Sequence, residues 1–292
     1  MANPFEARGE WFKGNLHSHT TRSDGRVTPE QRVRGYEQHG YDFLALSDHG
    51  RVTSVFGLDT SLTLISAGEY TATNPWGGAT FHLLALGIPT SFYALPDMAI
   101  QEAIDAVRSA GGIPVVAHPY WCGLTIKDLE RLDDVPGIEI FNTTCGNGIG
   151  KDLSTVHWDD LLASGWRGWG LAVDDCHFPD LDVYAGWIVA KARSKTAEDL
   201  LAAIADGTFY STTGPTIHSV KRTGNTLHVE CSEVDWINFN ADRAQGRRVR
   251  NLDGSPIASA SYQLTGNERY VRIECVSRQH GTAWTNPFYA AG

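Results

Sequence analysis

The side chains that can do chemistry in this chain of 292 residues are histidines and carboxylates at short, repeated spacings. Two pairs stand two residues apart, His17 with His19 and Asp175 with His177. Further candidates lie between these pairs in the sequence: Asp24, His49, Glu69, His82 and His118. Imidazole and carboxylate together suit Zn²⁺, Mn²⁺ or Fe²⁺ better than Ca²⁺. The sequence therefore predicts a site for divalent cations.

The spacing within each pair orients its side chains. In an extended segment, residues i and i+2 point to one face of the backbone and the residue between them points away. His17 and His19 then face one cavity, and Asp175 and His177 repeat the arrangement. Cys176, which stands between the second pair, is expected to pack in the interior.

Up to about residue 214, short apolar runs alternate with helical patterns, which is typical of β/α folds. Strands are predicted to run into residues 14–16 and over 43–47, 62–66, 81–87, 113–117, 137–141, 169–173 and 187–192. Helices are predicted from Thr28 to about Gly40 and over 99–110, 127–132, 154–165 and 196–206. Thr28 is expected to cap the first of them, with Pro29 at its first position and Gln31 completing a capping box.

Most candidate ligands fall just beyond the C-terminal end of a predicted strand. In β/α barrels the loops that follow the strands converge at that end, where active sites are built. We therefore expect the histidines and carboxylates to meet in one place, on an α/β fold that resembles a TIM barrel.

From Pro215 onward helical periodicity disappears, and alternating strand-like segments are separated by Gly, Asn and Asp turns. The sequence predicts two domains, a metal-dependent barrel over 1–214 and a small all-β, β-sandwich-like domain over 215–292.

Composition excludes several classes of protein. A formal net charge of −10 argues against general nucleic-acid binding. We find no signal-peptide pattern and no run of about 18 apolar residues, so we expect a cytoplasmic protein without a membrane span. The five cysteines form no CxxC pair, which argues against a thiolate zinc site. Cys231 and Cys275 could face each other across two sheets, but we expect reduced thiols.

The motif series HSHTTRSDG (17–25), SDHG (47–50), GEY (68–70), FHLLALG (81–87), AHP (117–119) and DDCH (174–177) resembles that of the PHP (polymerase and histidinol phosphatase) family. The motifs occur in the family order over roughly residues 11–214. The resemblance implies a distorted (β/α)7 barrel with a trinuclear metal site. It is closer to the stand-alone enzymes than to the polymerase-attached domains, because the chain has no polymerase module.

Carried over position by position, the resemblance implies three metal positions. The first takes His17, His19, Glu69 and Asp175. The second shares Glu69 and adds His82 and His118, and the third is held by Asp24, His49 and His177. Catalytic roles fall on Glu69, Asp175 and His177, while Asp48 is expected to fix an imidazole by hydrogen bonding.

Three positions keep alternatives open. Cys145 can replace or join His118 near the second metal, although AHP is the better motif match and a buried thiol is the plainer interpretation. Arg22 is a candidate phosphate clamp, because its planar guanidinium suits phosphate oxygens. Tyr120 and Trp121, directly after His118-Pro119, either stack on a ring of the substrate or close the barrel mouth.

The expected function is a metal-dependent phosphoesterase that hydrolyses small phosphomonoesters such as nucleotides or sugar phosphates. Two or three divalent metals (manganese, zinc or iron) would lower the pKa of bound water, and the resulting hydroxide would attack phosphorus. The alternatives are a carbamate or carboxyl ester hydrolase, because FNTTC, WDDLL and DDCH also resemble the CehA/McbA-type relatives, and a binding protein that acts through the C-terminal β-domain. No feature of the sequence selects one metal, one substrate or an oligomeric state.

Overall fold

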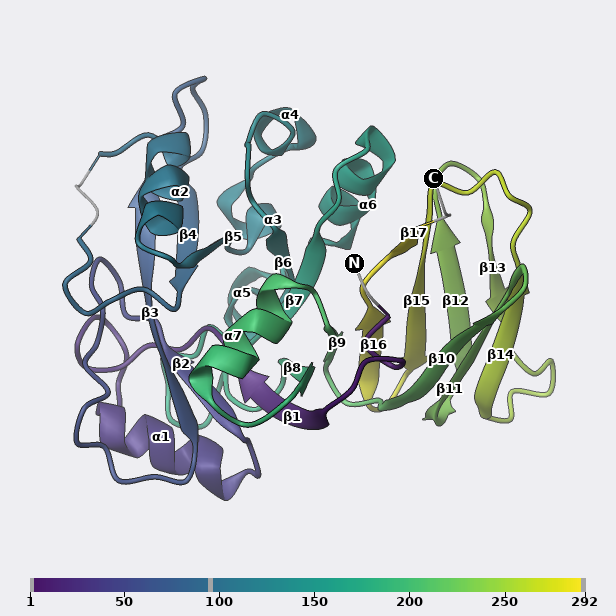
Figure 1. Cartoon of the computed structure of the whole chain (residues 1–292), viewed down its shortest axis with the longest axis horizontal. Coiled ribbons are helices and arrows are strands. Elements are labelled where there is room, and N and C mark those ends of the chain that lie inside the picture. The colour runs from purple at the N-terminus through teal and green to yellow at the C-terminus, as the bar shows by residue number, and fades with distance from the viewer. Residues whose placement is uncertain (1–2, 94–96, 290–292) are drawn as a thin grey trace.

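The computed structural model of this chain describes residues 3–93 and 97–289. The protein is a mixed α/β structure in which helices surround the strands of the first two thirds, while the last third consists of strands (Figure 1). Within the described residues, no helix combines the length and the apolarity that crossing a membrane requires.

The main sheet carries the first strands of the chain, in the spatial order β9-β8-β1-β2-β3-β4-β5-β6-β7. Their bounds are β1 (Glu10–Asn15), β2 (Phe43–Leu46), β3 (Thr63–Ala72), β4 (Phe81–Leu86), β5 (Ile113–Val116), β6 (Gly137–Asn142), β7 (Trp169–Val173), β8 (Trp187–Ala192) and β9 (Phe209–Thr212). All four residues of β2 and all five of β7 are buried, as expected of strands that are covered on both faces.

Strand direction departs from a regular β/α alternation. Strands β1 to β3 are mutually parallel, and so are β5 to β7, but β4 runs antiparallel to both of its neighbours. Strand β8 is antiparallel to both of its neighbours as well, β1 and β9. An α/β fold with one large sheet is confirmed, whereas a (β/α)7 barrel is not.

Side-chain hydrogen bonds connect β7 to β9 and to the segment ahead of β8, where a barrel would close. Among the described residues no backbone ladder joins β7 to β8. The Ser211 hydroxyl on β9 instead accepts a hydrogen bond from the Ala172 N–H and donates one to the Gly170 carbonyl, both on β7. Asp174, just after β7, accepts the N–H groups of Tyr184 and Gly186 ahead of β8. These bonds satisfy backbone groups that a ladder would otherwise pair.

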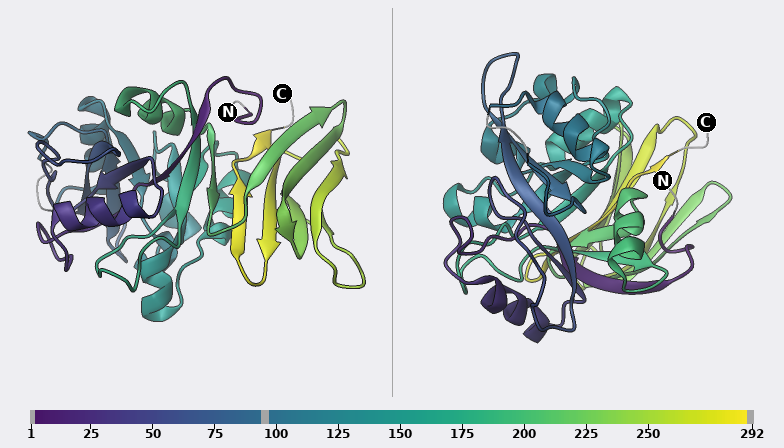
Figure 2. Two further views of the ribbon diagram at one scale, coloured as in Figure 1. Left: turned by 90° about the horizontal axis from the view of Figure 1, so that it is seen from below. Right: turned by 60° about the vertical axis from the view of Figure 1, so that its left-hand side comes forward.

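The helices pack outside the strands (Figure 2). Their bounds are α1 (Pro29–Gln38), α2 (Ile100–Ser109), α3 (Pro119–Cys122), α4 (Ile126–Leu129), α5 (Thr143–Ile149), α6 (Thr155–Ser164) and α7 (Ala197–Ala205). The capping box of Thr28 and Gln31 at the start of α1 is confirmed. Helices α3 and α5 were not predicted; α5 forms because the Asn142 side chain accepts a hydrogen bond from the Cys145 N–H.

The C-terminal part is a pair of facing sheets, as the alternating pattern predicted. One sheet holds β10 (Ile217–Thr223), β11 (Thr226–Val234) and β14 (Ile257–Gln263); the other holds β12 (Trp236–Ala241), β13 (Gly246–Val249), β15 (Tyr270–Ser277), β16 (Gly281–Thr285) and β17 (Phe288–Tyr289). Val229, Phe239 and Ile273 contribute to the core between them. Cys231 and Cys275 lie in the same core as free thiols.

The two parts of the chain share one sheet, because β16 pairs with β9. A buried ion pair reinforces this junction: the guanidinium of Arg272 on β15, which is 2% exposed, contacts Asp159 of α6 at 2.6 Å. The same guanidinium lies over the Trp158 ring. A buried cation of this kind is tolerated only because its partners satisfy its donors.

We expect Arg272→Leu to lower the free energy of unfolding by about 3 kcal/mol, because it leaves the Asp159 and Glu274 carboxylates without their buried cation. Urea denaturation measures the loss. Arg278→Leu is the control, since Arg278 is 68% exposed and 3.7 Å from Asp235, and should cost less than about 1 kcal/mol. Equal losses of unfolding free energy in both variants would contradict the conclusion that the Arg272 ion pair stabilises the junction.

Candidate metal centre

The candidate ligands lie together at one edge of the main sheet. Most follow directly on β1, β2, β5 or β7: His17, His19, His49, His118, Asp175 and His177. Glu69 lies inside β3, which continues to Ala72, and not after a strand as predicted. Since β4 is antiparallel to β3, His82 near its beginning lies at the same edge, opposite Thr71.

Four donor atoms at this edge enclose a position of the size of a metal ion. Nε2 of His17 lies 3.1 Å from Nε2 of His19 and from Oε2 of Glu69, and 3.2 Å from Oδ1 of Asp175. Nε2 of His19 lies 3.2 Å from that Glu69 oxygen and 2.9 Å from that Asp175 oxygen. Donors held tetrahedrally at about 2.0–2.1 Å from a cation are about 3.3 Å apart. This group matches the set expected for the first metal.

The other oxygen of Glu69 faces a second set of imidazoles. Oε1 lies 2.7 Å from Nδ1 of His82 and 3.2 Å from Nε2 of His118. Nδ1 of His49 lies 3.1 Å from Oε2, so Glu69, His49 and His82 also form a group with metal-ligand spacing. The carboxylate therefore has one oxygen toward each of two adjacent positions, as a bridging ligand requires.

A third group lies toward the solvent. Oδ2 of Asp24 is 3.4 Å from Nε2 of His177 and 3.6 Å from Nε2 of His49, and the Asp24 side chain is 55% exposed. His19 also belongs to this group through its other nitrogen, 3.7 Å from Asp24, a contact that the sequence did not predict. The Nδ1–H of His177 donates to the Asp175 carbonyl at 2.7 Å, which leaves Nε2 for a ligand.

The electrostatics of the cluster fit cations. Burial lowers the pKa of His19, but hydrogen bonds to Asp175 and Glu69 outweigh it and raise the pKa to about 9. Burial raises the pKa of Glu69, yet the nearby His17, with hydrogen bonds from His118, His17 and His19, brings it well below its usual range. Buried carboxylates that require this much positive charge suit divalent metals, which displace the protons of the imidazoles.

Sequence reasoning missed Glu139, a buried carboxylate of β6 that supports three candidate ligands. Its Oε1 accepts the His17 Nδ1–H at 2.6 Å, and Oε2 accepts the His118 backbone N–H at 2.9 Å. Asn142 bonds both Glu139 and Oδ2 of Asp175 through its amide nitrogen, at 3.0 and 3.1 Å. A carboxylate behind an imidazole fixes its tautomer and ring orientation. The available signal was a charge inside the apolar strand GIEIF.

Two candidate ligands have backbones in the left-handed region, where non-glycine residues are rare. His118 has φ of 27° and Asp175 has φ of 56°. The Asp175 N–H donates to the His17 carbonyl at 2.9 Å, and the His118 N–H donates to Glu139. Such conformations cost about 1–3 kcal/mol each and persist where surrounding bonds enforce them.

Asp48 has a role other than the one expected. Its carboxylate accepts hydrogen bonds from the Thr20 N–H and hydroxyl, from the Ser23 hydroxyl and from Thr53, and contacts no imidazole at hydrogen-bond distance in the described residues. It therefore fixes the loop that carries Asp24. The Ser23 hydroxyl lies 3.4 Å from Nδ1 of His19, so any effect of Asp48 on that ring passes through Ser23.

A cavity of about 340 Å³ opens onto the candidate ligands. Its wall includes Arg26, Trp121, Cys145 and Phe178, but Arg22 is exposed and does not line it. Burial, with the charges of Asp175 and Glu139, raises the pKa of the Cys145 thiol. Cys176 is fully buried, 3.1 Å from the Tyr36 hydroxyl, which confirms it as a packing residue.

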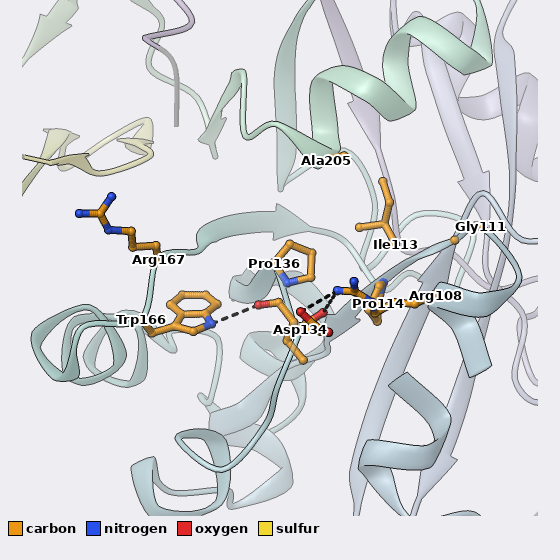
Figure 3. Close-up of a pocket in the computed structure, with 11 residues that line it drawn as sticks. Arg108, Gly111, Ile113, Pro114, Asp134, Pro136, Trp166, Arg167 and Ala205 are labelled. Carbon is orange, nitrogen blue, oxygen red and sulfur yellow. Dashed lines mark hydrogen bonds and ion pairs between the residues drawn. The ribbon is translucent and has the colours of Figure 1, made fainter. Parts of the chain in front are cut away.

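A larger cavity, of about 510 Å³, lies at the other end of the strands (Figure 3). It is lined by Ile113 at the start of β5 and by Pro136 and Arg167 ahead of β6 and β7. None of the described residues on its wall is a histidine, and its carboxylate, Asp134, pairs with Arg108 at 3.1 Å. We therefore place the functional site at the metal-ligand end.

The comparisons with known proteins concern the fold. No family model matches the sequence, and no curated protein matches it. Among solved structures, the chain is similar to a two-domain protein from Bacteroides vulgatus that contains a predicted PHP-like metal-dependent phosphoesterase, with 14% identity, 96% of each chain covered and a TM-score of 0.55. An amidohydrolase from Chromobacterium violaceum with bound sulfate and no metal is 17% identical, with 58% of this chain and 89% of that chain covered and a TM-score of 0.47. The first similarity shows a shared fold over both parts of the chain, in agreement with the PHP-like resemblance of the motifs.

We expect Glu139→Gln to weaken metal binding about 10–100-fold, because the amide turns a donor toward either His17 or the His118 N–H. Competition with a chromophoric chelator for Zn²⁺ or Mn²⁺ measures the affinity, and a thermal melt checks folding. Glu130→Gln is the control, because it makes the same chemical change at an exposed position. A folded Glu139 variant with unchanged affinity would refute the supporting role.

Metal affinity should rise with pH between 7 and 9. The metal-free protein holds a proton on His19, whose pKa is about 9, and a metal must displace that proton, so affinity gains up to roughly tenfold per pH unit for each proton released. The same chelator competition at several pH values measures the slope, and a pH indicator counts the protons. A dissociation constant that stays flat over this range would contradict it.

Proposed function

We propose that this protein is a metal-dependent phosphoesterase that hydrolyses small phosphomonoesters. The observation that carries the proposal is the Glu69 carboxylate, whose two oxygens face two adjacent donor sets at the floor of a cavity. Paired cations suit the transfer of a phosphoryl group, because they can neutralise both the attacking and the leaving oxygens. The fold that the chain shares with a protein containing a predicted PHP-like phosphoesterase supports this choice.

We assign the ligands as the motifs imply. His17, His19, Glu69 and Asp175 would hold the first cation, and Glu69, His82 and His118 would hold the second. Asp24, His49 and His177 would hold a third, which would complete a trinuclear site of manganese, zinc or iron. When bound, the metals lower the pKa of water and stabilise negative charge on phosphoryl oxygens.

The residues of the chain supply binding and proton transfer. In the part of the chain that the structure describes, no carboxylate or carbonyl pairs with the Arg26 guanidinium, which lines the cavity and can bind phosphoryl oxygens with two parallel hydrogen bonds. It takes the role first considered for Arg22. If the third position were empty, the imidazolium form of His177 would be placed to protonate the leaving oxygen from Nε2, since its Nδ1–H is fixed on the Asp175 carbonyl.

We also propose that residues 1–214 form the catalytic domain and 215–292 an accessory β-domain. All assigned ligands precede residue 178, and the described residues after β9 form strands without helices. The accessory part joins the first domain where β16 pairs with β9, so we assign it a stabilising role and leave the chemistry to the first domain.

The test is phosphate release from a panel of monoesters and diesters by the Mn²⁺-loaded protein. The panel includes nucleotides, sugar phosphates and simple alkyl phosphates. We expect turnover of monoesters, and we expect Asp175→Asn to reduce it by more than the ~10–100-fold typical of residues that only support a ligand. Asp180→Asn, an exposed neighbour, should leave turnover unchanged.

The same protein is also offered carboxyl and carbamate esters, on which the same site could act at carbon. Silence on every phosphate ester, from protein shown to contain its metals, would refute the phosphoesterase proposal. Turnover of the carbon esters in that case would identify the alternative hydrolase, and silence on both panels would leave the binding role of the C-terminal part.

A further inference from the structure

Two aromatic side chains line the cavity above the candidate ligands, from different loops. Trp121 belongs to α3, directly after His118, and Phe178 directly follows His177. They are 42% and 41% exposed. Large exposed aromatic surface beside a polar site marks a place where a ligand is bound.

The candidate ligands and helix α3 fix the position of Trp121. Its ring packs edge-on against the His118 ring at a centroid distance of 5.1 Å and lies 5.8 Å from that of His82. Helix α3 is held by hydrogen bonds from the Cys122 N–H to the His118 carbonyl and from the Tyr120 N–H to the Ser154 hydroxyl. The indole is therefore a rigid wall on the His82–His118 side of the cavity.

Phe178 is fixed in the same way on the His177 side. Its N–H donates to Oδ1 of Asp182 at 2.9 Å, and its carbonyl accepts from the guanidinium of Arg32 at 2.9 Å. Arg32 is itself buried, 3% exposed. With the backbone held by two charged groups, the exposed ring costs little entropy when a ligand covers it.

Hydrogen-bonding groups for a polyhydroxylated ligand are scarce in this cavity. Apart from the candidate ligands and Arg26, the hydrogen-bonding side-chain groups on its wall are the indole N–H of Trp121, the thiol of Cys145 and the hydroxyl of Thr144. That hydroxyl is already committed to the Asp175 carbonyl at 2.7 Å and to Asp182 at 2.9 Å. Sugar hydroxyls would therefore find few partners on this wall, and a polar group that loses its water without a new partner weakens binding.

We propose that the substrate is a phosphomonoester of an aromatic, non-sugar alcohol, with its ring against Trp121 and Phe178 and its phosphoryl group at the metals and Arg26. This inference rests on the proposed phosphoesterase function and names its substrate class. It also assigns Trp121, and not Tyr120, as the aromatic residue that contacts substrate: Tyr120 lies outside the cavity, beside Lys151 and His157.

The reaction consumes one water for each ester. A new P–O bond forms from the water oxygen, and the bond between phosphorus and the alcohol oxygen breaks. One proton of the water goes to the departing alkoxide, so the products are the free aromatic alcohol and inorganic phosphate. Because the ring is on the leaving group, its contact with Trp121 would orient the P–O bond that breaks.

The experiment compares four phosphates with the Mn²⁺-loaded protein: benzyl, cyclohexylmethyl, glucose 6- and methyl phosphate. The leaving group of each ester is an unactivated alcohol, so the four substrates differ chiefly in the group that would contact Trp121 and Phe178. We expect kcat/KM for benzyl phosphate to exceed that for cyclohexylmethyl phosphate by about tenfold, because stacking on an aromatic side chain adds to apolar burial. Glucose 6-phosphate should be a poor substrate.

The variant Trp121→Leu should lower kcat/KM for benzyl phosphate about tenfold more than that for methyl phosphate, while Trp121→Phe retains most of the preference. Tyr120→Leu is the matched control, since Tyr120 is the adjacent residue and is 43% exposed. Calorimetric binding of benzylphosphonate against methylphosphonate provides a readout apart from turnover. Metal content is measured for every variant.

Equal turnover of benzyl and cyclohexylmethyl phosphate would overturn this inference and leave the phosphoesterase proposal intact. So would a Trp121→Leu variant that loses all four substrates equally, because Trp121 would then act by supporting the imidazoles beside it. No turnover of any phosphate, methyl phosphate included, would instead refute the phosphoesterase proposal on which the inference rests.

Discussion

The burial of the Glu69 carboxylate is the constraint on which the rest of this structure depends. It is 1% exposed, and its two oxygens lie within 3.2 Å of nitrogens from five imidazoles. A carboxylate taken out of water at this depth needs hydrogen-bond donors or positive charge at both oxygens, and here the imidazoles supply them. Strand β3 must therefore extend far enough to bring Glu69 to the sheet edge. Strands β1, β2 and β5 must each be followed within three residues by a histidine, and β4 must run in the opposite direction so that His82 reaches the same point.

The other buried carboxylates of this edge differ from Glu69 in what surrounds them. Asp48 is surrounded by hydroxyl and N–H donors of the loop that it fixes. Asp174 accepts the Tyr36 hydroxyl at 2.6 Å together with three backbone N–H groups, and closes the gap between β7 and β8. Groups saturated in this way have no lone pairs left for a cation, so they are structural. Glu69 and Asp175 face imidazole nitrogens, which must give up protons if a metal is to bind. The partners of Asp48 and Asp174 thus separate these two residues from the candidate ligands beside them in the sequence, whereas Glu139 combines an imidazole partner, His17, with the His118 N–H and the Asn142 amide.

The sequence predicts features that depend on local patterns and misses those that depend on contacts between distant segments. The positions of His17, His19, Asp175 and His177 follow from alternation and from the ends of strands, both of which are local patterns. Strand direction is not local, and so the antiparallel β4 and the extended β3 were not foreseen. Helix α5 contains Thr, Gly and Asn, which are weak helix formers, and it depends on a cap from Asn142. Arg22 and Arg26 stand in one short loop, and only the turn that Asp48 fixes decides which of them lines the cavity.

Two loops contribute both to the floor of the cavity and to its aromatic wall. His118 and Trp121 share the turn after β5, and His177 and Phe178 are neighbours after β7. The left-handed backbone of His118, enforced by Glu139, sets both the direction of its imidazole and the start of helix α3. Any change that relaxes this strained residue moves a candidate ligand and the substrate wall together. Substrate preference in such a site cannot drift independently of metal binding, and substitutions that alter one without the other must act on the exposed rings themselves and not on the backbone that carries them.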